Sequence, residues 1–166
     1  MEVSKLQDGD ILICTSNRII PTAIKKATKS KWTHTAQVFT AWDVLGVTEA
    51  QSDGVHWIPF DVWVKKYNYE FIVYRRRIIN IEKLAQRAFS KLGDTGYDYH
   101  SFLIRQPISL LTGKFISLPY EKEEDKMICS EYTAWTEQWN RPETFTPDKV
   151  EKFCRRSIRY ELISLE

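Results

Sequence analysis

The residues best suited to nucleophilic chemistry in this sequence are its three cysteines, Cys14, Cys129 and Cys154. No two of them form a C-x-x-C pair, and any disulfide scheme leaves one unpaired, so we expect reduced thiols. A thiol becomes a good nucleophile when its pKa falls, as happens at a helix N-terminus or beside an imidazolium. The surroundings of each cysteine therefore decide which of them can react.

Cys129 opens a predicted helix in the segment KMICSEYTAW. Four apolar residues recur at the spacing of one helix face: Ile128, Tyr132, Trp135 and Trp139. Pro142 is expected to end the helix. Cys129 lies one position off this face, where unpaired N–H groups and the helix dipole would stabilise a thiolate or an oxyanion. Cys129 is the candidate nucleophile, and a core cysteine is the alternative.

The other two cysteines have apolar settings. Cys14 ends the apolar run that begins at Ile11, and Cys154 follows Val150 and Phe153 at helical spacing. Both are expected to be small buried hydrophobic residues.

A reactive cysteine also needs a base, and the chain has three histidines. His34 lies in an alternating segment, 33–40, that predicts a strand with His34, Ala36, Val38 and Thr40 on one face. His56 and His100 lie in settings typical of exposed residues. His34 is the leading candidate, although a structural, hydrogen-bonded histidine is the alternative at this position.

A third group would orient the imidazole and stabilise its charge. If 33–40 pairs with 47–51 about a centre between Ala41 and Trp42, Glu49 lies opposite His34. A slip of two residues would bring Gln51 there and keep the same face. Glu49 is the preferred residue, with Gln51 and Asp53 as alternatives.

The order of elements predicts an α+β fold, an antiparallel sheet or partial barrel flanked by helices, in a single domain spanning 1–166. Strands are expected near 11–14, 33–40, 47–51, 55–58, 69–75 and 160–163, with a turn over Asp43 to Gly46. Helices are expected over 21–28, 61–66, 81–92 and 147–155, besides the one at Cys129. Asn80 would cap the third of these at its start and Gly93 would stop it.

Composition restricts the classes of partner. A net charge of +2 and no exposed stacking motif argue against nucleic acid. No secretory signal and no apolar run long enough to cross a bilayer are present, so we expect a cytoplasmic location and no integral membrane segment. No ligand spacing typical of zinc occurs, and neither a metal nor another cofactor is expected. Oligomeric state is not predicted.

Several short segments, in this order, resemble the circularly permuted papain-like enzymes of the NlpC/P60 superfamily, specifically the YiiX/YebB-like group. The segments are Asp8 to Leu12, Ser30 to His34, Glu49-Ala50 with Gly54-Val55, Gly96 to Asp98, Ile128 to Glu131 and Thr146 to Asp148. The histidine precedes the cysteine along the chain, as the permuted branch requires. The resemblance implies a papain-like fold with Cys129 as nucleophile, His34 as base and Glu49 as orienting group.

The resemblance also implies acyl transfer: a thiol hydrolase that cleaves an amide or ester through an acyl-enzyme. Related families act on cell-wall peptides, N-acyl amino acids or lipid esters, so the partner would be a small-molecule, peptide or lipid-like acyl substrate. Tyr97, Trp32 and Ser130 are candidates for substrate contacts, and a packing role is the alternative for Tyr97. An acyltransferase of the same superfamily and a non-catalytic binding protein of the same fold are the alternative functions.

Overall fold

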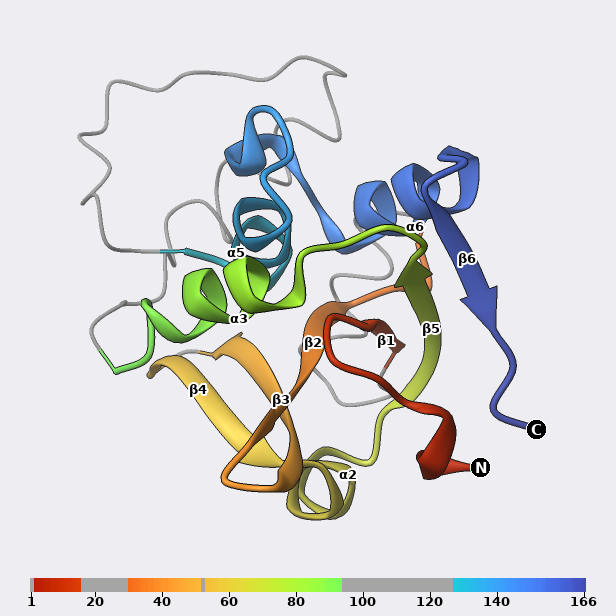
Figure 1. Cartoon of the computed structure of the whole chain (residues 1–166). Coiled ribbons are helices and arrows are strands. Elements are labelled where there is room, and N and C mark those ends of the chain that lie inside the picture. Colours follow the sequence, from red (N-terminus) through yellow and green to blue (C-terminus); the bar gives the residue numbers. More distant parts are fainter. Residues whose placement is uncertain (1, 16–29, 52, 94–126) are drawn as a thin grey trace.

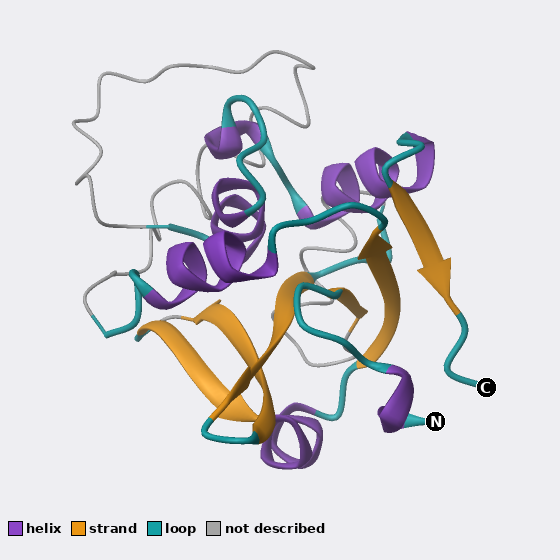
Figure 2. Cartoon of the chain, in the orientation of Figure 1, coloured by secondary structure: helices purple, strands orange, loops and turns teal. Residues whose placement is uncertain are grey.

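The computed structural model describes residues 2–15, 30–51, 53–93 and 127–166, and its secondary structure is the predicted mixture of helices and one antiparallel sheet (Figures 1 and 2). The predicted helix over 21–28, the candidate Tyr97 and the alternative base His100 lie outside these residues.

Six strands form one sheet in the order β4-β3-β2-β1-β5-β6, and every neighbouring pair is antiparallel. The strands are β1 (Ile11–Thr15), β2 (His34–Ala41), β3 (Val44–Gln51), β4 (Gly54–Pro59), β5 (Glu70–Arg76) and β6 (Tyr160–Ile163). β4 and β6 are the two edges of the described sheet, so the sheet is not closed into a barrel. The helices and the antiparallel sheet together confirm the predicted α+β class.

Helices cover both faces of the sheet (Figure 1). They are η1 (Val3–Lys5), α2 (Phe60–Tyr67), α3 (Ile81–Phe89), α5 (Cys129–Thr136), η3 (Pro142–Thr144) and α6 (Pro147–Arg156). α2 packs on one face, whereas α3, α5 and α6 lie on the other (Figure 2). Among the described helices, none has the length and apolar character needed to cross a membrane.

Alternation along the central strands divides the core between the two faces. Leu12, Ala36 and Val38 pack with Trp63 of α2 in one buried cluster. Neighbouring residues of the same strands, Ile13 for example, point to the opposite face and join clusters with α5 and α6. The side of β2 that carries His34 therefore faces α2.

The β2–β3 turn differs from the prediction. Trp42 and Asp43 form a two-residue turn with left-handed backbone angles (φ 49° and 59°) and Ala41 pairs with Val44. This geometry suits the right-handed twist of a hairpin, although asparagine and glycine are the usual residues there. The strand pairing is centred between Trp42 and Asp43, so the predicted register was wrong by two residues and the alternative slip is the one observed.

Helix starts agree with the sequence better than helix ends. The side chains of Asn80 and Thr146 accept hydrogen bonds from backbone N–H groups three residues ahead, as N-caps do. α3 ends at Phe89 and not at Leu92, the residue before the predicted stop at Gly93. α5 ends at Thr136, well before Pro142, because the chain adopts a left-handed conformation at Gln138 (φ 59°).

Gly46 lies within β3 and not in the predicted turn, directly under the indole ring of Trp57. A Cβ at this position would lie 2.3 Å from a ring atom of Trp57. The indole is fixed because its Nε1 donates to the Phe39 carbonyl at 2.9 Å. The close approach explains a glycine in the middle of a strand.

Gly46→Ala is therefore expected to lower the free energy of unfolding by about 1 to 3 kcal/mol, since overpacking forces the indole away from its site. Urea denaturation of the single variants and of Gly46→Ala combined with Trp57→Leu would measure this. The combined loss should be smaller than the sum of the single losses. Simple additivity would show that the indole is not what excludes a side chain at Gly46.

Candidate active site

The N-terminus of α5 places Cys129 against the start of β2. Ile128 is extended (φ −89°, ψ 163°) and precedes the helix, so Cys129 is its first residue. The Thr133 hydroxyl bonds to the Cys129 carbonyl at 3.1 Å and to the Thr35 hydroxyl at 3.0 Å. These bonds tie the first turn of α5 to β2. Cys129 is only 4% exposed.

His34 is the first residue of β2 and bridges the thiol and a carboxylate. Its Nε2 lies 2.7 Å from Oε2 of Glu49. Cys129 lies close enough to the imidazole for each group to shift the pKa of the other. The three residues that the sequence singled out are thus brought together from β2, β3 and α5.

Glu49 is fully buried on the α2 face of the sheet and is surrounded by donors. Trp63 Nε1 donates to Oε2 at 2.8 Å, and Gln51 Nε2 donates to Oε1 at 2.9 Å. The observed register, continued to the start of β2, places Gln51 and not Glu49 opposite His34. Glu49 still reaches the imidazole because residues two apart on a strand share a face, and diagonal cross-strand neighbours lie within reach of long side chains.

Aromatic rings hold the imidazole from the α2 side. Tyr69 stacks on His34 with ring centroids 5.4 Å apart and an interplanar angle of 19°. Tyr67 stacks in turn on Tyr69, and Trp63 packs against both tyrosines. Stacking and the Glu49 bond together restrict the ring to one orientation.

The electrostatics of the site favour a thiolate and an imidazolium. Burial opposes ionisation of Cys129, but the charge and hydrogen bond of His34, together with backbone N–H groups of Thr35 and Ser130, hold the pKa of the thiol below its ordinary value. Burial likewise disfavours the imidazolium, yet the negative charges of Cys129 and its other neighbours raise the pKa of His34 well above its usual range. Each group therefore stabilises the charged form of the other.

Glu49 remains ionised in this setting. Burial alone would raise the pKa of its carboxyl group, but the charge and hydrogen bond of His34 and the bonds from Trp63 and Gln51 lower it. The other two cysteines behave differently, because burial raises the pKa of Cys14 and of Cys154 far above that of an ordinary thiol. Both are buried apolar residues, as predicted.

The remaining candidates have other surroundings. The Ser130 hydroxyl donates to the Phe145 carbonyl at 2.9 Å. The backbone N–H of Ser130 is a separate group, and it hydrogen-bonds to the Cys129 thiol and lowers its pKa. Trp32 is buried in the cluster that includes Ile11 and Ile13. His56 and Asp53 pair with each other, with 2.9 Å between Nε2 and Oδ1.

Sequence reasoning missed the residues that support His34 and Glu49. Trp63 and Tyr69 come from α2 and from the residue before β5, far from either strand in sequence. A buried carboxylate and a buried histidine both require partners, and this requirement is the signal that points to nearby side-chain donors and rings. The sequence does not say which of the aromatic residues supply them.

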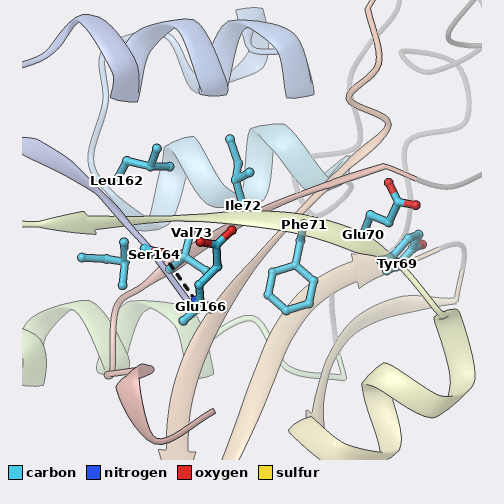
Figure 3. A pocket seen from close by; sticks show the side chains of 10 residues that line it. Tyr69, Glu70, Phe71, Ile72, Val73, Leu162, Ser164 and Glu166 are labelled. Atoms are coloured by element: carbon cyan, nitrogen blue, oxygen red, sulfur yellow. Dashed lines mark hydrogen bonds between the residues drawn. The ribbon is translucent and has the colours of Figure 1, made fainter. Parts of the chain in front are cut away.

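A groove of about 640 Å³ begins beside this site and runs between the start of β5 and the chain at the end of β6 (Figure 3). Its walls are residues 69–73 and 162–166. Tyr69, which stacks on His34, lines one end, but Cys129 is not among the lining residues. Within the described part of the chain, no group of three or more His, Cys, Asp or Glu side chains is arranged to hold a metal ion.

Comparison with known proteins gives one informative result. No protein-family model matches the chain, and no curated protein matches its sequence. Among solved structures, the chain is similar to YiiX from Escherichia coli O157:H7, which is described as a metalloprotein. The two share 20% identity with a TM-score of 0.57, over 96% of this chain and 97% of YiiX. The chain thus has a YiiX-like fold over almost its whole length, which confirms at the level of fold the similarity to the YiiX-like group predicted from the sequence.

Proposed function

We propose that this protein is a thiol hydrolase that cleaves an amide or ester bond through an acyl-enzyme on Cys129. The observation that carries the proposal is the buried His34 imidazole, whose Nε2 lies 2.7 Å from the Glu49 carboxylate and whose charge lowers the pKa of the neighbouring Cys129 thiol. A cysteine, a base and an orienting group within hydrogen-bond reach are what nucleophilic acyl transfer requires.

Each residue of the site has its own role in the reaction. The Cys129 thiolate attacks the substrate carbonyl carbon, and the resulting oxyanion is stabilised by N–H groups at the start of α5. The carbon–nitrogen or carbon–oxygen bond breaks, and the leaving group takes a proton from the His34 imidazolium. Neutral His34 then removes a proton from water, which attacks the thioester and releases the acid. Glu49 keeps the ring oriented and stabilises its positive charge.

The chain order of these residues supports a permuted papain-like relationship. The histidine strand precedes the cysteine helix, and the fold similarity to YiiX spans both. YiiX is described as a metalloprotein, but among the described residues of this chain no three His, Cys, Asp or Glu side chains are arranged as the three protein ligands of a catalytic zinc site would be. No step above uses a metal.

Trapping the acyl-enzyme tests the proposal directly. The protein is incubated with activated acyl donors (aryl esters and thioesters of short acyl chains) and quenched in acid, and the modified residue is located by peptide mass spectrometry. We expect the acyl group on Cys129 and its turnover to free acid, with added amines tested as competing acceptors. Cys14→Ser and Cys154→Ser serve as matched controls and should acylate normally. Equal acylation of Cys129→Ser, or none by any donor, would contradict the proposal.

A further inference from the structure

The outer end of the β5–β6 ladder carries two isoleucines that are almost fully exposed. Ile78 and Ile158 are each 88% accessible, more than any other described large apolar residue. Arg76 pairs with Tyr160, and the next backbone bond runs from Arg77 N to Arg159 O at 2.9 Å. Ile78 follows Arg77 and Ile158 precedes Arg159, so both isoleucines adjoin this last bond. Residues remote in sequence thus present two apolar side chains at one tip.

Arginines surround this isoleucine pair. Arg77, Arg155, Arg156 and Arg159 are exposed, and residues 155–159 and 75–78 contain no acidic side chain. Arg155 pairs with Glu151 at 2.9 Å and Arg77 with Glu161 at 3.7 Å. Arg156 and Arg159 have no acidic partner among the described residues. The tip therefore has an excess of positive charge beside two apolar side chains that are exposed to solvent and not packed in the core.

We propose that this tip, defined by Ile78, Ile158, Arg156 and Arg159, docks the protein on the surface of an anionic lipid bilayer. Apolar side chains that insert at the headgroup boundary and basic residues that bind lipid phosphates are the two contributions that hold peripheral proteins on membranes. Guanidinium groups suit phosphate because they bind its oxygens bidentately. This interaction is independent of the chemistry at Cys129.

Other anionic partners fit the tip less well. A nucleic acid would use the arginines on its phosphates, but its recognition also favours aromatic stacking or base-edge donors, and isoleucine provides neither. An acidic protein would need a surface of standard size, on the order of 800 Å² per partner, whereas the exposed apolar part of the tip is two side chains. A bilayer can take up isolated projecting residues without a matching shape.

The test is cosedimentation of the full chain with vesicles of phosphatidylcholine, with and without phosphatidylglycerol, at low and high salt. We expect binding to the anionic vesicles only, weakened by salt. Arg156→Gln with Arg159→Gln should lower the partition coefficient on the order of thirtyfold, because each arginine contributes near a charged surface. Ile78→Ser with Ile158→Ser should lower it at least about tenfold.

Matched controls separate the tip from general properties of the surface. Lys65→Gln with Lys66→Gln removes the same charge from α2, and Trp42→Ala removes an 84% exposed apolar residue from the β2–β3 turn. Both should bind vesicles as the unmodified protein does. Equal binding to neutral vesicles, no effect of the tip substitutions, or tighter binding to an RNA oligonucleotide or a polyglutamate peptide would overturn the proposal. Alkylation of Cys129 in each variant reports separately on the thiol site.

Discussion

Replacing His34 with alanine is expected to slow alkylation of Cys129 by iodoacetamide near pH 6 at least about tenfold. The imidazolium and its hydrogen bond oppose the effect of burial and hold the pKa of the thiol below its ordinary value. Without them the thiol should return to a pKa of about 8.5 or higher, with roughly 0.3% thiolate at pH 6. A more basic thiolate is intrinsically more nucleophilic, which offsets part of this loss.

The rate is read at each cysteine by peptide mass spectrometry. His56→Ala is the matched control, because His56 is also a strand histidine with a carboxylate neighbour, Asp53, and should leave the Cys129 rate unchanged. An unaltered rate in His34→Ala would contradict the thiolate–imidazolium pair. Cys14 and Cys154 should react slowly in all three proteins, since burial raises the pKa of both thiols.

Removing the Glu49 carboxylate is expected to have the largest effect on stability. Glu49→Ala should lower the free energy of unfolding by about 3 to 5 kcal/mol, since it leaves the His34 charge and the Trp63 and Gln51 donors unpartnered in the core. Glu49→Gln keeps the shape and should cost less, while still slowing alkylation of Cys129 near pH 6. Urea denaturation measures the first effect. A loss below about 1 kcal/mol in Glu49→Ala would show that the carboxylate is dispensable for folding.

The pH dependence of this loss has a definite sign. The folded pKa of Glu49 is lowered, so its contribution should be complete above the unfolded value of about 4.3 and shrink as pH falls through the folded value. The folded pKa of His34 is raised, so its contribution should be complete below about 6.5 and shrink as pH rises past the folded value. The stability difference between the unmodified protein and Glu49→Gln should therefore be greatest between these limits. A difference that is constant from acid to alkaline pH would contradict the charged pair.

The sequence predicted the local part of this site well. A helix that starts at Cys129 follows from its apolar spacing, and the face of β2 that carries His34 follows from simple alternation. The cap Asn80 was also predicted, because capping depends on residues only three positions apart. Each of these predictions rests on interactions within one segment.

Predictions that required two segments were weaker. The β2–β3 register depended on which two residues form the turn, and Trp42-Asp43 lacks the usual sequence signal for that conformation. Glu49 was still the right neighbour for His34 because both registers keep it on the same face. The partners Trp63 and Tyr69 were not predicted, since only the packing of α2 under the sheet brings them to the site.

Titration of the thiolate ultraviolet absorbance, compared between the unmodified protein and Cys129→Ser, tests the central claim most directly. The difference between the two curves reports the ionisation of Cys129 alone. We predict a thiolate that is already formed well below the ordinary pKa of about 8.5, in a protein that remains folded throughout. A difference curve that rises only at or above about pH 8.5 would contradict the ion pair with His34, and with it the proposed nucleophile.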